Sequence, residues 1–153
     1  ALTHGNIDYA EFGFDGGVEF PPHNLACRNL ADRFPFKKPF RGFVGEYEEI
    51  ANLYLEREYP HKNVFRGVFP AWDNTPRTGD RAVIVSNSSP NNYEYWLSQA
   101  IERTCEDFPG QERLVFINAW NEWAEGNYLE PNSRYGLEYL EVLRNCVLGG
   151  ESD

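Results

Sequence analysis

Methionine is absent from this sequence of 153 residues, and cysteine is scarce. The three cysteines, Cys27, Cys105 and Cys146, lie far apart and form no CxxC pair, so neither a zinc site nor a disulfide framework is indicated. Their odd number favours a reducing compartment, and we expect a cytoplasmic location. Because the sequence begins at Ala1 without an initiator methionine, we interpret it as a piece of a longer protein.

Positive charge is also in short supply. Lysine and arginine total 14 residues against 24 aspartates and glutamates, which gives a net charge of -10 and a pI of about 4.8. A strongly acidic chain is repelled by nucleic acids and by anionic membrane surfaces, so we expect neither as a partner. No apolar run is long enough to cross a bilayer, and we therefore predict no membrane span. A neutral substrate is compatible with this charge.

Motifs for nucleotides, cofactors and metals are missing as well. The sequence contains no GxGxxG loop, no GxxxxGK[ST] loop and no DxD metal motif. The three histidines, His4, His23 and His61, show no ligand spacing, and for His23 we favour a loop or supporting role. We therefore expect no cofactor and no bound metal.

Aromatic residues, in contrast, are abundant. They make up 16% of the sequence within a hydrophobic fraction of 41%, which indicates a globular domain. Aromatic rings stack well on the C–H faces of sugars, so the composition suits contact with carbohydrate. Filling the core is the other common use of such side chains.

Hydrophobic periodicity predicts alternating strands and helices. We expect strands within residues 14–20, 40–47, 64–69, 82–85 and 114–117, and helices over 46–59, from Pro90 behind a Ser89 cap, and over 134–147. Such alternation is typical of βαβ units with a parallel sheet. The stretch 24–39 is poorly periodic and is interpreted as a loop.

These elements predict an α/β fold of barrel type. An eight-unit barrel takes roughly 250 residues, or about 31 per unit, so this chain would supply about five units. We therefore predict that residues 1–153 form one domain, the C-terminal half of a (β/α)8 TIM-type barrel. A small doubly wound domain is the alternative, and it would need a nucleotide-type loop at a strand exit.

The segment Leu114–Pro131 carries the strongest functional pattern. Its apolar start, Leu114–Ile117, predicts a strand buried on both faces, and polar and aromatic residues follow at the carboxyl end of that strand. Parallel α/β folds place their chemistry at such strand ends. Glu122 and Glu125 are separated by a length of chain that spans at most about 10 Å, so both carboxylates can reach one cleft.

Two carboxyl groups near an anomeric carbon are what glycosyl transfer requires. One acts as an acid at the leaving oxygen, and the other as nucleophile, base or charge stabiliser. We therefore predict Glu122 and Glu125 as the catalytic pair. Their spacing leaves open which one is the acid and whether configuration is retained or inverted. A bare ExxE pair is more often a solvated helix face, and the surrounding tryptophans and asparagines are what favour catalysis here.

Other side chains are expected to bind the sugar. The predicted substrate-binding residues are Trp120, Asn121, Trp123, Asn118, Trp72, Asp73, Glu19 and Tyr128. Trp72 and Asp73 follow the strand predicted at 64–69; a buried indole beside a turn residue is the alternative for these two. Glu19 could instead cap a turn before Pro21. A pair between Arg134 and Glu130 is interpreted as structural support.

Three stretches of the sequence resemble a known family. NAWNEWAEGNYLEPNSRYGLEYLE, which begins at Asn118, resembles the signature of WbsX-type proteins, a group similar to glycoside hydrolase family 99 and often labelled glycosyltransferase. FDGGVEFPPH at residues 14–23 and FPAWDNTPR at residues 69–77 match the same group in the same order. The resemblance implies that an N-terminal half of the domain is missing here and that the remainder of the barrel comes from that half.

The resemblance also implies roles for the two glutamates. Family 99 consists of endo-acting α-mannosidases and mannanases on (β/α)8 barrels, whose motif resembles NEWHEG. By that resemblance Glu122 would take the proton of the 2-hydroxyl group, and Glu125 would be the acid and base at the leaving oxygen. Ala124 stands where the hydrolases carry histidine, so the sequence departs from the hydrolase motif at this position.

We therefore predict an enzyme that acts on the glycosidic bonds of a polysaccharide, with a glycan as its partner. A glycosyltransferase of bacterial surface polysaccharide synthesis, such as O-antigen or lipopolysaccharide, is the first alternative. A non-catalytic glycan-binding module that uses the tryptophans is the second.

Overall fold

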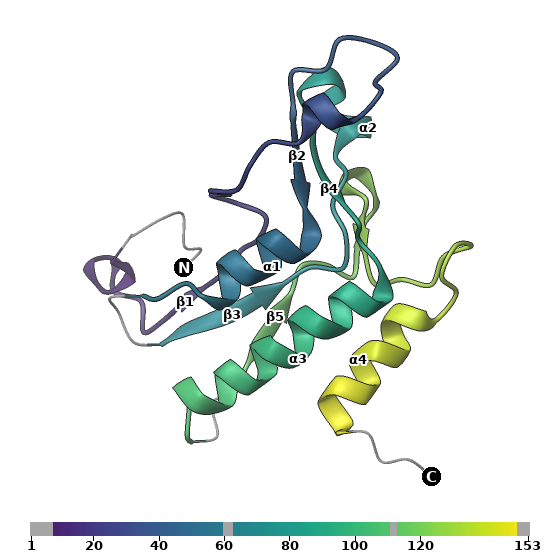
Figure 1. The fold of residues 1–153 in the computed structure, drawn as a ribbon. Coiled ribbons are helices and arrows are strands. Elements are labelled where there is room, and N and C mark those ends of the chain that lie inside the picture. The colour runs from purple at the N-terminus through teal and green to yellow at the C-terminus, as the bar shows by residue number, and fades with distance from the viewer. Residues whose placement is uncertain (1–7, 60–62, 111–112, 150–153) are drawn as a thin grey trace.

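The computed structural model describes residues 8–59, 63–110 and 113–149, and its parallel strands form two sheets (Figure 1). The larger sheet has the order β1-β3-β5, from β1 (Gly17–Val18), β3 (Val64–Val68) and β5 (Val115–Ile117). The smaller sheet pairs β2 (Phe43–Glu46) with β4 (Val83–Ser86). The predicted α/β class is confirmed. His4 and His61 lie outside the described residues.

Helices follow the strands much as the sequence predicts. They are α1 (Tyr47–Leu55), α3 (Pro90–Asp107) and α4 (Glu138–Leu148), with a single turn at α2 (Thr75–Thr78) and 3-10 turns at η1 (Tyr9–Phe12), η2 (Ala31–Arg33), η3 (Gly79–Arg81) and η4 (Trp123–Glu125). The predicted cap of α3 is confirmed, because the Ser89 hydroxyl accepts a hydrogen bond from the Asn92 amide at 3.2 Å. Within the described ranges, no helix is long and apolar enough to cross a membrane.

The start of α4 differs from the prediction by four residues. A helix was expected from Arg134, but the Asn132 side chain accepts hydrogen bonds from the amides of Arg134 and Tyr135 at 2.8 and 2.9 Å. These bonds stabilise a non-helical turn at residues 132–135, so the helix starts only after it. The helix then ends at Gly149, whose φ of 62° is a conformation that glycine adopts without a steric penalty.

The arrangement of the strands differs more from the prediction. About five barrel units in one sheet were expected, but the described residues hold three successive units, β1–α1, β3–α3 and β5–α4. The connections in the first two units contain the additional strands β2 and β4, which pair with each other instead of joining the larger sheet. A count of residues per unit cannot detect such insertions. A partial barrel is therefore not confirmed by this topology.

The core lies between the larger sheet and the helices that cover one of its faces (Figure 1). Trp96 of α3 sits at its centre with 1% of its surface exposed. Its ring contacts those of Tyr47, Tyr54 and Phe69 at centroid distances of 5.6, 5.7 and 5.0 Å. Aromatic pairs at such distances add to the free energy of burial. This cluster fixes α1 and α3 against β3, whose carboxyl end carries part of the candidate site.

The environment of β5 corrects one expectation from the sequence. The run Leu114–Ile117 was predicted to be buried on both faces, yet Leu114 and Phe116 are 51% and 43% exposed. The reason is that β5 is an edge strand of the larger sheet and the described helices cover only one face of that sheet. An apolar run alone does not distinguish a central strand from an edge strand.

Candidate functional site

The polar segments that follow β3 and β5 leave the same edge of the larger sheet. The two strands are neighbours in register, with Val68 opposite Ile117. Beyond them the Asn118 amide donates to the Val68 carbonyl at 2.9 Å, and the Asp73 amide donates to the Glu125 carbonyl at 2.7 Å. The stretches FPAWDNTPR and NAWNEWAEG are therefore held side by side by their main chains.

Gly126 makes this close approach possible. It has a φ of 58°, and a Cβ atom placed there would lie 3.1 Å from the backbone nitrogen and oxygen of Asp73. Both the left-handed conformation and the short distance favour glycine over any other residue. The glycine that follows Glu125 thus fixes the distance between the two strand exits.

The two predicted catalytic residues lie on one tight hairpin. Its strands are β6 (Asn121–Glu122) and β7 (Asn127–Tyr128), and the single 3-10 turn η4 connects them. Glu122 is the N-cap of η4, and Glu125 is its last residue. Side chains three positions apart in a 3-10 helix project to the same side, with a rise of about 6 Å between them. The local fold thus supports a shared orientation of the two carboxylates.

The surroundings of the two glutamates are unequal. Only 16% of the Glu125 side chain is exposed, and its Oε1 atom accepts a hydrogen bond from Arg77 Nη1 of α2 at 2.5 Å. Charge-assisted contacts of this kind are stronger than neutral ones. Glu122 is exposed, and its carboxylate has no hydrogen bond to another of the described residues. Glu125 is therefore held in place, while Glu122 is free to meet a ligand.

Trp123 and Tyr128 form the aromatic side of the hairpin. Their rings stack with a centroid distance of 3.7 Å, and Trp123 Nε1 donates to Glu130 Oε2 at 2.6 Å. Glu130 thus supports the indole. The expected pair between Glu130 and Arg134 does not form, because Arg134 lies over the Tyr135 ring at 4.8 Å instead.

A hollow of about 580 Å³ lies next to this aromatic side. Its wall includes four of the predicted substrate-binding residues, Trp72, Asp73, Trp123 and Tyr128. Asn87, Asn132, Arg134, Tyr135 and Tyr139 also contribute to the wall. Aromatic walls with a few polar groups are typical of sites for small polar ligands. The hollow could hold a sugar ring.

The two glutamates are not among the residues that line this hollow. The register of the hairpin places Asn121 opposite Tyr128 and Glu122 opposite Asn127. Cross-strand partners share a face, and adjacent residues point to opposite faces. Tyr128 therefore faces the hollow while Glu122 is on the other face of the hairpin. The aromatic hollow is therefore not the one cleft that the sequence led us to expect for both carboxylates.

The remaining predicted residues are dispersed. Trp120 is 51% exposed, and Asn121 is exposed on the hairpin. Asn118 is partly buried and its side chain donates to the Pro21 carbonyl at 3.0 Å. That bond ties the exit of β5 to the segment after β1, so Asn118 serves the position of the loop in this structure.

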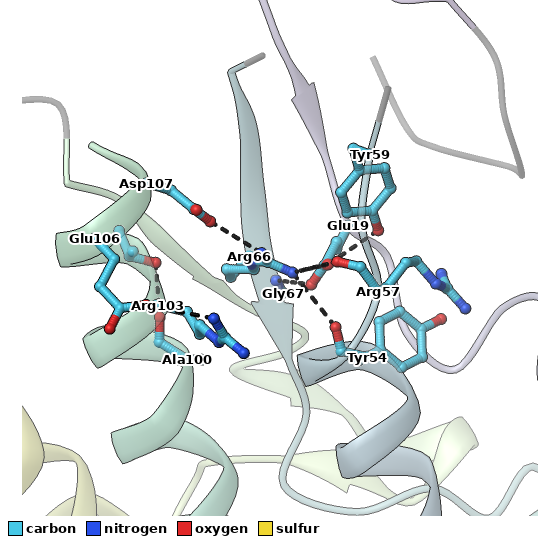
Figure 2. A network of polar contacts seen from close by, with 11 residues as sticks. Glu19, Tyr54, Arg57, Tyr59, Arg66, Gly67, Ala100, Arg103, Glu106 and Asp107 are labelled. Atoms are coloured by element: carbon cyan, nitrogen blue, oxygen red, sulfur yellow. Dashed lines mark hydrogen bonds and ion pairs between the residues drawn. The ribbon is translucent and has the colours of Figure 1, made fainter. Parts of the chain in front are cut away.

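Glu19 requires a correction. It was expected to bind sugar hydroxyls, but it is 2% exposed and its oxygens already accept hydrogen bonds from the Gly67 amide and the Tyr59 hydroxyl, both at 2.9 Å. Figure 2 shows Arg66 between Glu19 and Asp107, at 3.3 and 2.9 Å. Burial raises the pKa of Glu19, although Gly67 and Arg66 oppose the shift. The carboxylate belongs to a buried network in the sheet.

Arg77 is the site residue that sequence reasoning missed. It lies in the quoted stretch FPAWDNTPR, where a lone arginine after a turn proline gives no signal of its partner. Only the pairing of β3 with β5 brings it to Glu125. For metals, the structure contains no cluster of three or more His, Cys, Asp or Glu ligands within its described part. His23 Nδ1 instead contacts the Phe20 carbonyl at 2.9 Å.

Comparison with known proteins adds a family relationship. The family described as "Glycosyltransferase WbsX" matches residues 2–143. Two proteins called "Uncharacterized protein WxcX", from two strains of Xanthomonas campestris pv. campestris, are each 37% identical over 141 residues. That alignment covers 92% of this chain and 20% of each relative, so the chain spans about a fifth of their length. No solved structure matches the chain.

Proposed function

The chain belongs to the WbsX glycosyltransferase family, and from that premise we propose that it is part of an enzyme acting on the glycosidic bonds of a polysaccharide, with Glu122 and Glu125 as its catalytic carboxylates. The observation that carries the proposal is the unequal surroundings of Glu122, the N-cap of η4, and Glu125, its last residue. Glu125 is mostly buried and held by Arg77, and Glu122 is open on the same turn. Two carboxyl groups in different environments are what acid and base roles require.

The roles of the pair follow the resemblance to family 99. Glu122, exposed on the hairpin, takes the proton of the sugar 2-hydroxyl, and Glu125 exchanges a proton with the leaving oxygen. Arg77 occupies Oε1 of Glu125, so Oε2 is the oxygen that would meet the glycosidic oxygen. Arg77 is then a positioning residue, because it acts through its contact with the Glu125 carboxylate.

The aromatic hollow gives this enzyme a place for a neighbouring sugar of the chain. Trp123 is 48% exposed and stacks on Tyr128, so its ring presents a flat surface at the edge of the hollow. A polysaccharide that crosses the hairpin would place one residue by the glutamates and another in the hollow. Such binding away from the reacting bond favours an endo-acting mode.

The active site of this proposal is completed by the rest of the polypeptide. The larger sheet is open on the side where Phe116 is 43% exposed, and the chain spans 20% of the relatives that it matches. We propose that preceding residues pair with the open sheet edges and close a barrel around the glutamates. Unpaired edge strands with exposed apolar side chains aggregate readily, so the isolated chain should be poorly stable.

The test uses the full-length protein and a panel of bacterial and fungal polysaccharides, with new reducing ends as the readout. Glu122→Gln and Glu125→Gln should each lower turnover by about 100-fold or more, because each removes a proton-transfer group. Glu94→Gln, on the exposed face of α3, is the matched control and should retain turnover. Wild-type rates in either site variant would overturn the assignment of the carboxylates.

A sugar-nucleotide transferase is the second candidate, and the description of the family favours it. Calorimetry with nucleotide sugars distinguishes the two reactions. Binding of a nucleotide sugar, with turnover that depends on it, would support the transferase. Glycan binding without turnover under either condition would support a non-catalytic module instead.

A further inference from the structure

A loop with an unusual composition leads into β2 and lies beside α2 at the top of Figure 1. We call Arg33–Arg41 the basic loop. It has the sequence RFPFKKPFR and holds four of the 14 lysines and arginines of the chain, with no aspartate or glutamate. Three of its nine residues are phenylalanines and two are prolines. The composition of the loop is opposite to that of the chain as a whole.

The basic loop is closed at its base. The Leu30 amide donates to the Val44 carbonyl at 2.8 Å, and the Asn29 side chain accepts from the Val44 amide and donates to the Gly42 carbonyl, at 3.0 and 3.1 Å. At Gly42, a Cβ atom would lie 2.0 Å from the Ala82 carbonyl oxygen. Loops whose ends are held together in this way are compact and often functional. The tip is thus presented by a fixed base.

The tip exposes both apolar and basic side chains. Phe34 and Phe36 are 41% and 39% exposed, and the Phe36 ring stacks on Phe40 at 4.1 Å. Lys37 and Lys38 are exposed, and neither has an ion pair within the described ranges. Stacking holds the rings at the surface, where their apolar faces are costly to leave in water. The basic groups beside them have no carboxylate to neutralise them.

Charge near the tip differs in sign from the net charge of -10. Two carboxylates adjoin the loop: Asp32 precedes it in the sequence, and Asp80 pairs with Arg41 at 2.6 Å. Four basic side chains therefore meet two carboxylates. Exposed charges separated by more than about 8 Å are largely screened at physiological salt. An anionic surface that touches the tip would thus respond to the loop and much less to the rest of the chain.

We propose that the basic loop docks the protein on an anionic lipid bilayer. Phenylalanines that enter the interface and lysines that reach anionic headgroups are the two contributions that peripheral membrane proteins combine. The loop projects at the top of Figure 1 and contains two prolines, and its Phe36 and Phe40 rings are stacked on each other. Binding of single-stranded nucleic acid would instead need a basic groove with rings free to stack on bases. The shape of the loop fits a flat bilayer better than a strand.

Flotation of the full-length protein with vesicles tests this proposal. The protein should float with vesicles that contain phosphatidylglycerol, should not float with phosphatidylcholine alone, and should dissociate as salt is raised. The double variant Lys37→Gln/Lys38→Gln should bind about 25-fold more weakly, since each basic residue near an anionic surface contributes about fivefold. Phe34→Ser/Phe36→Ser should weaken binding about tenfold or more by removing apolar contacts.

The matched control is Arg103→Gln/Arg144→Gln, which removes the same charge from exposed positions on α3 and α4. It should bind as the wild type does. Circular dichroism shows whether each variant is folded before its binding is compared. No flotation of the wild-type protein, an equal loss in the control, or binding of an RNA oligonucleotide without binding of vesicles would each overturn the proposal.

Discussion

Two Glu–Arg pairs connect segments of neighbouring strands, and they differ in how far solvent reaches them. In the pair of Glu19 with Arg66, the side chains are 1% and 10% exposed, and protein groups occupy both carboxylate oxygens. In the pair of Glu125 with Arg77, they are 16% and 63% exposed, and Arg77 contacts a single oxygen. The carboxylate of the first pair is saturated by the protein, although Arg66 Nε is buried without a hydrogen-bond partner. The second leaves an oxygen for a ligand.

This difference separates a structural pair from a candidate catalytic one. A buried carboxylate is tolerated only when its hydrogen-bonding oxygens are satisfied, and Glu19 meets that condition. A catalytic carboxylate has to keep one group available to the substrate, and Glu125 meets that condition. Burial alone would have ranked Glu19 above Glu125 as a candidate catalytic residue. The number of carboxylate oxygens already occupied by protein groups is therefore the better criterion for a catalytic carboxylate.

The largest expected effect on the free energy of unfolding comes from breaking the pair of Glu19 with Arg66. Arg66→Ala leaves the carboxylate of Glu19 buried without its cation, and it also removes bonds to the Tyr54 and Arg57 carbonyls. The free energy of unfolding should fall by about 3–5 kcal/mol, as for other buried pairs that lose one partner. Urea denaturation of the full-length protein measures the change. A loss below 1 kcal/mol would show that the network is not a source of stability.

Breaking the pair of Glu125 with Arg77 should change activity more than it changes the free energy of unfolding. Arg77→Gln removes a mostly exposed guanidinium, so the unfolding free energy should change by about 1 kcal/mol or less. Turnover should fall by about 10- to 100-fold, because Glu125 loses the contact that orients it. Arg77→Lys should restore part of the rate. A rise in KM alone, with kcat unchanged, would contradict a positioning role.

The raised pKa of Glu19 predicts that the free energy of unfolding depends on pH. Burial raises this pKa above the ordinary value of 4.5, so the folded state holds the proton more tightly than the unfolded state. The stabilisation that comes from the protonated Glu19 carboxyl group is complete below pH 4.5, and it is lost as pH rises through the raised pKa of the folded state. Unfolding free energies of wild type and Glu19→Gln, measured over this range, should therefore diverge with pH. Parallel curves would contradict the shift.

The smallest effect on the free energy of unfolding is expected from a third ion pair, which lies at the protein surface. Arg103 and Glu106 lie one helical turn apart in α3 at 3.4 Å, with side chains 53% and 67% exposed. Arg103→Gln should alter the unfolding free energy by about 0.5 kcal/mol or less, because both groups are well hydrated without each other. The same denaturation assay provides the comparison with Arg66→Ala.

The local parts of this structure were predictable from the sequence, and their long-range pairing was not. Ser89 and Pro90 predicted the start of α3. The polar residues after β3 and β5 were expected at the ends of strands, where the structure has them. The pairing of β2 with β4 depends on where two inserted strands meet, which no local pattern records. For this reason the number of barrel units was overestimated.

The candidate site shows the same division. The sequence predicted Glu122 and Glu125 as a pair from their type and spacing, and the 3-10 turn that joins them is a local feature. The partners of Glu125 and Glu19 come from segments about 48 and 47 residues away, so only the folded sheet reveals them. The face of the hairpin to which each residue points also depends on its register, which period-two alternation alone leaves open.

A hydrogen bond connects the basic loop to the segment that follows α2, and it links the loop to the candidate site. The Arg41 amide donates to the Asp80 carbonyl at 2.7 Å, and Asp80 follows Arg77 by three residues. A surface that grips the loop is thereby linked through a short, hydrogen-bonded path to the guanidinium that holds Glu125. Docking of the basic loop on a bilayer would therefore fix the height and tilt of Glu125, the proposed catalytic carboxylate, above the lipid surface.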